Sequence, residues 1–163
     1  MTIATPTLPE SLIATLPGHY YTDDGVFALE QEKVFETMWF CAVRAADLDK
    51  PGAFRTVQVG RESVLITRSR KGEVRAFFNV CRHRGAQLCT EDSGEVKRAF
   101  QCPYHAWTYD LDGKLIAAPN LTKMPDVDRT EYGLRTIAVR EWLGYVWVCL
   151  DDEPPSFEAT VMQ

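Results

Sequence analysis

The sequence predicts a mainly β domain of small antiparallel sheets, preceded by one helix. From residue 50 onward, short apolar segments alternate with turn-forming residues, which is typical of antiparallel strands. Before that point, apolar residues recur once at helical spacing, between residues 26 and 38. The length of 163 residues suits one domain with a hydrophobic core.

The first expected element is the helix at residues 26–38, after a loosely structured lead-in at 1–18. The preceding Asp23-Asp24-Gly25 indicates a helix entry with aspartate as the N-cap. The apolar stripe of this helix either joins the core or docks on a domain outside this sequence, and we expect the core. Its members are Phe27, Val34, Phe35 and Met38.

Seven β segments are expected after the helix, joined by turns rich in glycine, and no further helix is expected after residue 50. Asp112 and Gly113 form the tightest of these turns, because this dipeptide tolerates positive φ. The segments span residues 54–59, 63–68, 74–80, 96–101, 109–116 (a hairpin), 134–140 and 145–150.

Composition excludes several classes of protein. The net charge of −5 argues against a nucleic-acid-binding surface, and no apolar run approaches the length of a membrane span. Residues 1–18 lack the basic start and apolar core of a secretory signal. Five cysteines without a signal predict a reducing, cytoplasmic compartment. Cys41 and Cys149 lie in apolar surroundings and are expected to be buried, unreactive thiols.

Two short motifs carry the chemistry: Cys81-Arg82-His83-Arg84-Gly85 and Cys102-Pro103-Tyr104-His105-Ala106-Trp107. Each directly follows a predicted strand, which would hold such a loop rigid. The eighteen residues between His83 and Cys102 leave room for a turn at 91–94 and a returning strand. The two loops are therefore expected to meet at one end of a sheet.

Two cysteines and two histidines are also a ligand set that zinc accepts. The C-x-H spacing is too tight for a zinc finger, however, and no helix follows to carry the histidines. An accidental set of polar residues is disfavoured further, because the motifs use two of only three histidines.

The two motifs resemble those of the Rieske family, and within it the ring-hydroxylating oxygenases, over roughly residues 40 to 155. The resemblance implies a Rieske-type fold with two cluster-binding loops and one [2Fe–2S] cluster per chain. It places Cys81 and Cys102 on one iron, and His83 and His105 on the other. Respiratory Rieske proteins add a disulfide between the loops, but this chain has Ala86 and Tyr104 at those positions.

The resemblance also places Arg84, Trp107 and Tyr109 around the cluster. Two ferric ions, two sulfides, two thiolates and two neutral imidazoles sum to zero charge, so histidine ligation raises the potential into a range of about −150 to +300 mV. High-potential relatives have a serine where this chain has Trp107, which predicts the low end of that range. Arg82, Arg84, Lys97 and Arg98 are expected as a positive rim for an acidic electron donor, although Lys97 and Arg98 fit a solvated strand surface equally well.

By this resemblance, residues 1–45 form the lead-in and helix, 46–155 the Rieske domain, and 156–163 a tail or the start of a missing catalytic domain. The oxygenases activate oxygen at a mononuclear iron held by two histidines and a carboxylate. Only His19 is left for such a site, so the chain is expected to hold no catalytic residues of its own. Whether the chain alone counts as an enzyme therefore stays open.

The expected function is electron entry into a Rieske non-heme iron oxygenase that hydroxylates a small organic substrate. A ferredoxin or flavin reductase would donate the electrons, and the oxygenase catalytic domain would accept them, in a homotrimer in the full-length context. Aromatic acids and quaternary amines are both open as substrates. The alternative is a free-standing Rieske-type ferredoxin, disfavoured by the long lead-in and the helix.

Overall fold

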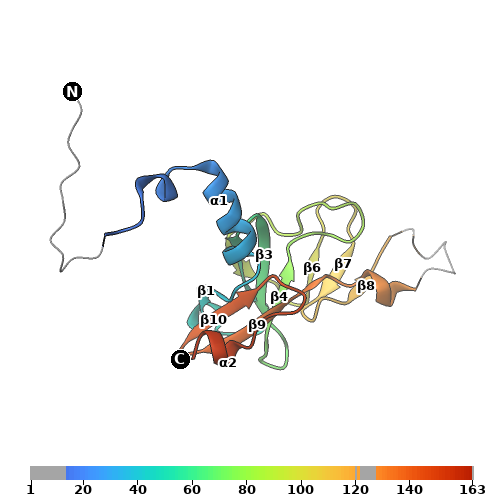
Figure 1. Cartoon of the computed structure of the whole chain (residues 1–163). Coiled ribbons are helices and arrows are strands. Elements are labelled where there is room, and N and C mark those ends of the chain that lie inside the picture. The colour runs from blue at the N-terminus through green and yellow to red at the C-terminus, as the bar shows by residue number, and fades with distance from the viewer. Residues whose placement is uncertain (1–13, 120, 122–127, 163) are drawn as a thin grey trace.

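A computed structural model describes residues 14–119, 121 and 128–162, and it confirms a mainly β chain (Figure 1). The described strands form two antiparallel sheets, one with seven strands and one with three. In spatial order, the larger sheet contains β1 (Phe40–Arg44), β10 (Tyr145–Cys149), β9 (Thr136–Trp142), β4 (Val74–Phe78), β3 (Glu62–Arg68), β2 (Ala53–Val59) and β5 (Ser93–Glu95).

Hydrophobic clusters pack on both faces of the larger sheet. Along β3, Leu65 belongs to one buried cluster, while Val64 and Ile66 belong to the other. Successive side chains of a strand point to opposite faces, so β3 contributes to both. The Leu65 cluster also contains both motif cysteines and covers the end of the sheet that carries the loops.

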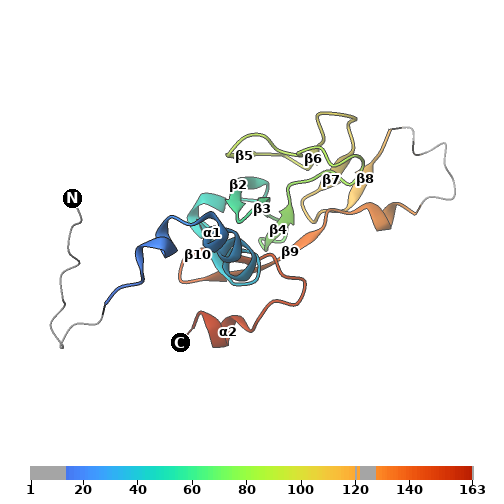
Figure 2. The same cartoon turned by 45° about the horizontal axis from the view of Figure 1, so that its top comes forward.

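The smaller sheet holds the second motif. It contains β6 (Ala99–Gln101), β7 (Thr108–Asp110) and β8 (Leu115–Ala117), and Figure 2 shows it on the side of β4 that faces away from α1. The connection from β6 to β7 is the second motif, whereas the first motif follows β4. The predicted hairpin turn between β7 and β8 is confirmed, with Gly113 at a φ of +81°.

The N-terminal helix forms, but its apolar stripe is not core. A short 3-10 helix, η1 (Gly18–Tyr21), precedes α1 (Asp24–Glu30), which continues directly into a π-helical turn, η2 (Gln31–Phe35). Asp23 caps it as predicted: its Oδ1 accepts hydrogen bonds from the backbone N–H groups of Gly25 (2.8 Å) and Val26 (3.0 Å). No residue of α1 or η2 is buried.

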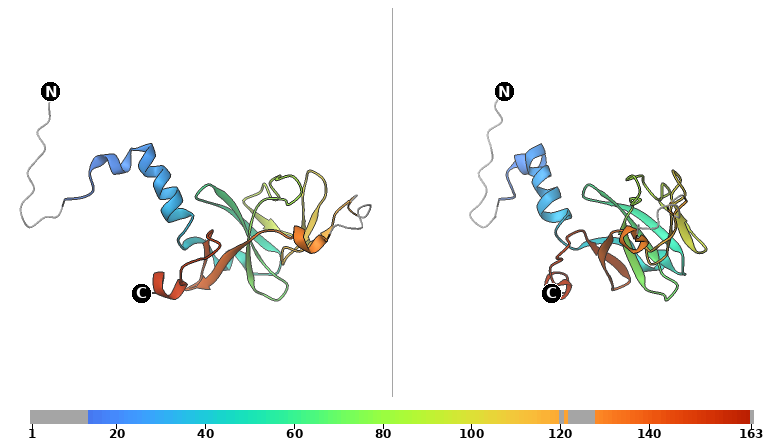
Figure 3. Two further views of the ribbon diagram at one scale, coloured as in Figure 1. Left: turned by 45° about the vertical axis from the view of Figure 1, so that its right-hand side comes forward. Right: turned by 90° about the vertical axis from the view of Figure 1, so that its right-hand side faces the viewer.

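The reason is that the faces of the sheet are already filled. Figure 3 shows α1 rising away from the sheet, so Phe27, Val34 and Met38 stay exposed. Near the C-terminal end of the helix, Arg61 pairs with Glu36 at 2.6 Å and ties it to the hairpin between β2 and β3. The expectation that the stripe is core is therefore wrong for this chain.

Strand β1 was not predicted, and it overturns the expectation for Cys41. β1 pairs with β10, and Cys41 lies opposite Trp147. Strand alternation turns Cys41 away from the cluster that its neighbours Phe40 and Ala42 contact, so its thiol is exposed. Cys149 is buried, as expected.

Other differences concern short elements. The predicted turn at residues 91–94 overlaps β5, and the strand expected from residue 96 begins only at Ala99. Short helices also occur where none was expected after residue 50: η5 (Arg129–Tyr132) and α2 (Phe157–Thr160). A further 3-10 turn, η3 (Ala45–Leu48), precedes β2. Segments this short carry too few residues to show periodicity. No helix within residues 14–119, 121 and 128–162 is long and apolar enough to span a membrane.

Candidate metal centre

The first motif is closed by two hydrogen bonds across its ends. The Cys81 N–H donates to the Ala86 carbonyl at 2.8 Å, and the Gly85 N–H donates to the Cys81 carbonyl at 3.1 Å. This closure requires Gly85 at a φ of +71°, in the left-handed region that glycine enters without strain. These hydrogen bonds fix the backbone of the loop, and the side chains between Cys81 and Gly85 project outward from it.

The second motif repeats this backbone plan. The Cys102 N–H donates to the Trp107 carbonyl at 2.8 Å, and the Ala106 N–H donates to the Cys102 carbonyl at 3.0 Å. Ala106 takes the place of Gly85, at a φ of +56°. An alanine in this region is strained, and such strain clusters at functional sites.

The structure brings the four expected ligands together. The cysteines are almost completely buried, with Cys81 2% and Cys102 3% exposed. The imidazoles of His83 and His105 are half-buried and lie edge to face, with ring centroids 4.7 Å apart. The sulfur side of the site is therefore dry, and its histidine side reaches the surface.

One buried nitrogen is left without a partner at this site. His105 Nδ1 is buried and makes no hydrogen bond within the described structure. A buried polar group without a partner is costly, and a metal ligand position satisfies it. The residues present therefore fit a metal group that takes this nitrogen together with the cysteine sulfurs.

Two metal groups accept this donor set. Two cysteines and two histidines can hold a single zinc ion, or a two-iron cluster that takes two protein ligands on each iron.

Tyr109 joins the two loops. Its hydroxyl accepts a hydrogen bond from the Arg82 N–H at 3.0 Å and lies 3.3 Å from Cys81 Sγ. Since the Arg82 N–H occupies the oxygen, the hydroxyl proton is free to point at the sulfur. Tyr109 is fully buried, and burial raises its pKa well above the ordinary value. It therefore acts as a permanent donor to the cysteine side.

Aromatic rings cover the histidine faces. Trp107 stacks on His83 with a centroid distance of 4.8 Å and an interplanar angle of 8°. The exposed ring of Tyr104 covers His105, with ring centroids 3.9 Å apart. Tyr132, which sequence reasoning missed, packs its ring at 78° to that of Trp107, with centroids 5.7 Å apart. In the sequence, Tyr132 lies in a short polar segment outside both motifs, and that position gives no sign of a role at the site.

Burial raises the pKa of the Cys81 thiol, and the neighbouring Cys102 thiol raises it further, against hydrogen bonds from Tyr109 and the His83 backbone. Burial, followed by the charges of His105 and Arg84, lowers the pKa of His83. In the chain without metal, these shifts favour the neutral Cys81 thiol and the neutral His83 imidazole. Metal binding must displace the thiol protons.

A second residue that sequence reasoning did not assign is Asn79, which lies just before the first motif. Its amide donates to the Cys89 carbonyl at 2.7 Å and to Ser63 Oγ at 3.1 Å, and its Oδ1 accepts from the Cys89 N–H at 2.9 Å. Asn79 is fully buried. It fixes the two ends of the first loop to each other and to β3.

The basic residues of the predicted rim come from two segments of the chain. Arg84 is exposed beside His83, and exposed Arg82 belongs to the same loop. Lys97 and Arg98 are exposed on the connection between β5 and β6. The predicted rim is therefore represented at the histidine side by Arg82 and Arg84.

Taken together, the two loops gather a dry pair of thiols, a half-exposed pair of imidazoles and a hydroxyl donor, which is the donor set of a candidate metal centre. A family model described as the Rieske [2Fe-2S] domain matches residues 38–136. The chain belongs to the Rieske [2Fe–2S] domain family, and the cofactor of that family is a [2Fe–2S] cluster.

Curated relatives are oxygenase subunits. The chain is 40% identical over 145 residues to the glycine betaine monooxygenase oxygenase subunit of Pseudomonas aeruginosa, covering 88% of this chain and 33% of the relative. It is 35% identical over 157 residues to the carnitine monooxygenase oxygenase subunit of Escherichia coli K12, covering 93% and 42%. The chain thus spans less than half the length of these relatives.

Solved structures agree. The quaternary ammonium Rieske monooxygenase CntA in complex with L-carnitine matches with a TM-score of 0.84 and 34% identity, covering 96% of this chain and 46% of that one. Naphthalene 1,2-dioxygenase from Rhodococcus sp. matches with a TM-score of 0.83 and 26% identity, covering 88% and 33%.

Proposed function

We propose that this chain is the electron-entry domain of a Rieske non-heme iron oxygenase. In this proposal, Cys81 and Cys102 hold one iron of the cluster, and His83 and His105 hold the other. The observation that carries it is the pairing of two buried cysteines with two half-buried histidines, one of which has a buried nitrogen without a partner. When bound, the cluster supplies reversible transfer of single electrons.

The side chains around the ligands have separate tasks. Tyr109 donates a hydrogen bond toward Cys81 Sγ, which favours the more negative, reduced state. The buried cysteine side keeps water out. The half-buried imidazoles of His83 and His105 provide the short route between the interior and a docked protein.

The proposed donor is a ferredoxin or a flavin reductase with an acidic docking surface. Support comes from the exposed Arg82 and Arg84 at the histidine side. Charges of opposite sign steer such encounters and make them depend on ionic strength. The proposed acceptor is the mononuclear iron of an oxygenase catalytic domain, reached within a homotrimer in the cytoplasm.

The proposed substrate is a quaternary ammonium compound, and the proposed reaction is monooxygenation. Support comes from the relatives, which are named for glycine betaine and for carnitine. In this family's oxygenases the substrate is bound by the catalytic domain, so the residues described above do not select it.

The test is an anaerobic titration of the purified chain with an NADH-dependent flavin reductase, followed by the visible absorbance of the cluster. About one electron per chain is expected, with about two irons and two sulfides bound. The His105→Ala variant should lose the cluster, and Arg44→Ala, on β1, should keep it. Reduction by dithionite but by no physiological donor would refute the donor, and a chain without iron would refute the function.

The same material separates the domain from a free-standing ferredoxin. A ferredoxin passes electrons to many acceptors, whereas the proposed domain delivers them to an oxygenase iron. Oxidation of glycine betaine or carnitine in a mixture that contains the oxygenase catalytic part, lost in the His105→Ala variant, supports the domain. Unchanged turnover with that variant would contradict it.

A further inference from the structure

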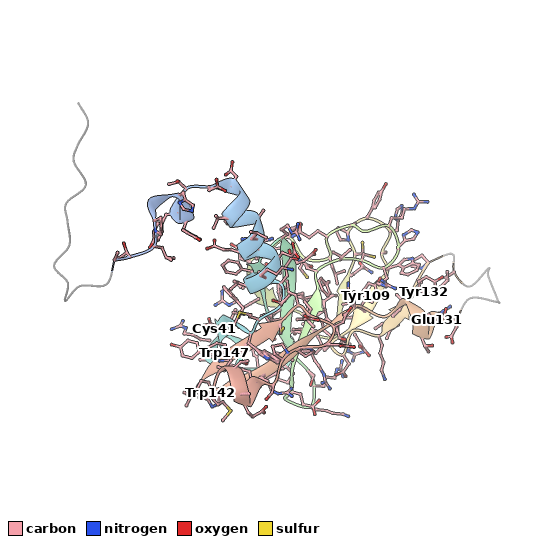
Figure 4. The ribbon with its side chains drawn as sticks, viewed as in Figure 1. Cys41, Tyr109, Glu131, Tyr132, Trp142 and Trp147 are labelled. Atoms are coloured by element: carbon pink, nitrogen blue, oxygen red, sulfur yellow. The ribbon has the colours of Figure 1, made fainter. Side chains whose placement is uncertain are left out.

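A buried pair of rings backs one histidine ligand from outside both motifs. Trp107 is 4% exposed and stacks on His83, and the ring of Tyr132 packs edge-on against the indole. Figure 4 shows Tyr132 near Tyr109, at the end of the molecule opposite Cys41, Trp142 and Trp147.

Tyr132 is fixed by anchors on both sides. Before it, Asp128 Oδ1 caps η5 by accepting from the Thr130 N–H at 2.8 Å. After it, buried Leu134 donates its N–H to the Gly113 carbonyl at 2.8 Å, which ties the segment to the hairpin between β7 and β8. The ring therefore presses on Trp107 from a rigid support.

The two histidines differ in this respect. The aromatic cover of His105 is Tyr104, whose side chain is 62% exposed. The cover of His83 is Trp107, which is shielded in turn by half-buried Tyr132. Both imidazoles are half-buried, but the aromatic cover of His83 is shielded from water and that of His105 is exposed.

This asymmetry has an electrostatic consequence. The oxidised cluster with two thiolates and two neutral imidazoles carries no net charge, and reduction gives it one negative charge. Water stabilises the charged form more than the neutral one. A wall that keeps water from a ligand therefore favours the oxidised state and lowers the potential.

We propose that Tyr132 is a positioning residue: it holds Trp107 flat against His83, keeps water from this ligand and thereby keeps the potential of the cluster low. This inference rests on the proposed ligand set, and it adds a residue that lies outside both motifs. The part that acts is the ring edge, because no hydrogen bond from the Tyr132 hydroxyl occurs among the described residues.

The test compares midpoint potentials of the purified holoprotein by spectroelectrochemical titration. Tyr132→Ala should raise the potential and speed the loss of cluster to a chelator several-fold, since water reaches the indole and His83. Tyr132→Phe keeps the ring and should behave as wild type. Tyr132→Leu keeps apolar bulk without the ring edge, so it should also raise the potential, and an unchanged potential in this variant overturns the inference if the alanine variant takes up no cluster.

A matched control separates this role from general packing. Phe157 is 4% exposed and contacts the rings of Trp39, Trp142 and Trp147. Phe157→Ala should lower the melting temperature and leave the potential unchanged.

An unchanged potential in both Tyr132→Ala and Tyr132→Leu, beside a normal wild-type cluster, would overturn this inference alone. A wild-type chain without a mixed-ligand cluster would instead overturn the proposed ligands, and the inference with them.

Discussion

Replacing Tyr109 by phenylalanine removes one oxygen from the centre of the site. The hydroxyl accepts from the Arg82 N–H at 3.0 Å and lies 3.3 Å from Cys81 Sγ. Phenylalanine keeps the buried ring, so the change acts on two hydrogen bonds and leaves the packing intact. The reduced, more negative cluster loses more stabilisation than the oxidised one, so the reduction potential should fall.

The size of the fall follows from hydrogen-bond energies. Hydrogen bonds to charged groups contribute about 1.5–3 kcal/mol and neutral ones about 0.5–1.5 kcal/mol. The hydrogen bond from Tyr109 is therefore stronger by about 1 kcal/mol in the reduced state than in the oxidised state. For one electron, about 59 mV corresponds to a factor of ten, or about 1.4 kcal/mol. The expected fall is therefore about 40 mV. The free energy of unfolding should also drop by about 1 kcal/mol, because the Arg82 N–H loses its acceptor.

The assay is a redox titration of Tyr109→Phe beside wild type, read by visible absorbance and by EPR. Tyr104→Phe is the matched control, since the Tyr104 side chain is exposed and its hydroxyl makes no hydrogen bond within the described part of the chain. A fall confined to Tyr109→Phe supports the reasoning. An equal or higher potential in Tyr109→Phe, with its cluster intact, would refute the donor role.

Three further predictions concern the frame of the loops, and each is tested by chemical denaturation of the chain without cluster. Asn79→Ala should lower the free energy of unfolding by about 2 kcal/mol, because the buried Cys89 N–H loses its partner while the Cys89 carbonyl keeps only the Gln87 amide. Gln101→Ala, at an exposed hydrogen bond, should change it by less than about 0.5 kcal/mol, and equal effects of the two substitutions would contradict the anchor. Ala106→Gly should raise the free energy of unfolding by about 0.5–1 kcal/mol, since the relief of left-handed strain exceeds the entropy cost of a glycine backbone. Gly85→Ala should lower the free energy of unfolding by about 1 kcal/mol, because it introduces the same strain. A change of the same sign in both variants would refute the backbone plan that the two loops share. Burial raises the pKa of Cys89 from 9.0 to about 12, so the folded chain keeps a proton that the unfolded chain releases as the pH rises. Between about pH 7 and pH 10, the free energy of unfolding should therefore fall by about 1.4 kcal/mol more in wild type than in Cys89→Ala. Parallel curves for the two proteins would count against the burial of this thiol.

The sheets were predictable because most strands carry their own local signals. Alternating apolar residues and turn glycines mark β2, β3, β4, β9 and β10, and Gly113 adopts the positive φ that its turn requires. β5 has no buried residue and hence no such signal. The fate of the helix stripe was not predictable, because periodicity shows that one face is apolar and does not show what covers it.

The site was predictable to a similar extent. The motif spacing led to the four ligands, which the structure brings together, and the resemblance added Tyr109 and Trp107, which it places around them. Asn79 and Tyr132 act through contacts between segments far apart in sequence. No local pattern reports such contacts, so only the folded structure shows them.

The proposed cofactor is a cluster with two cysteine and two histidine ligands. Its most direct test is EPR spectroscopy of the purified chain during anaerobic reductive titration. We expect a rhombic signal with a low average g value, lost when His83 or His105 is replaced by alanine. An average g value typical of all-thiolate clusters, or a chain that contains zinc and gives no signal, would contradict it.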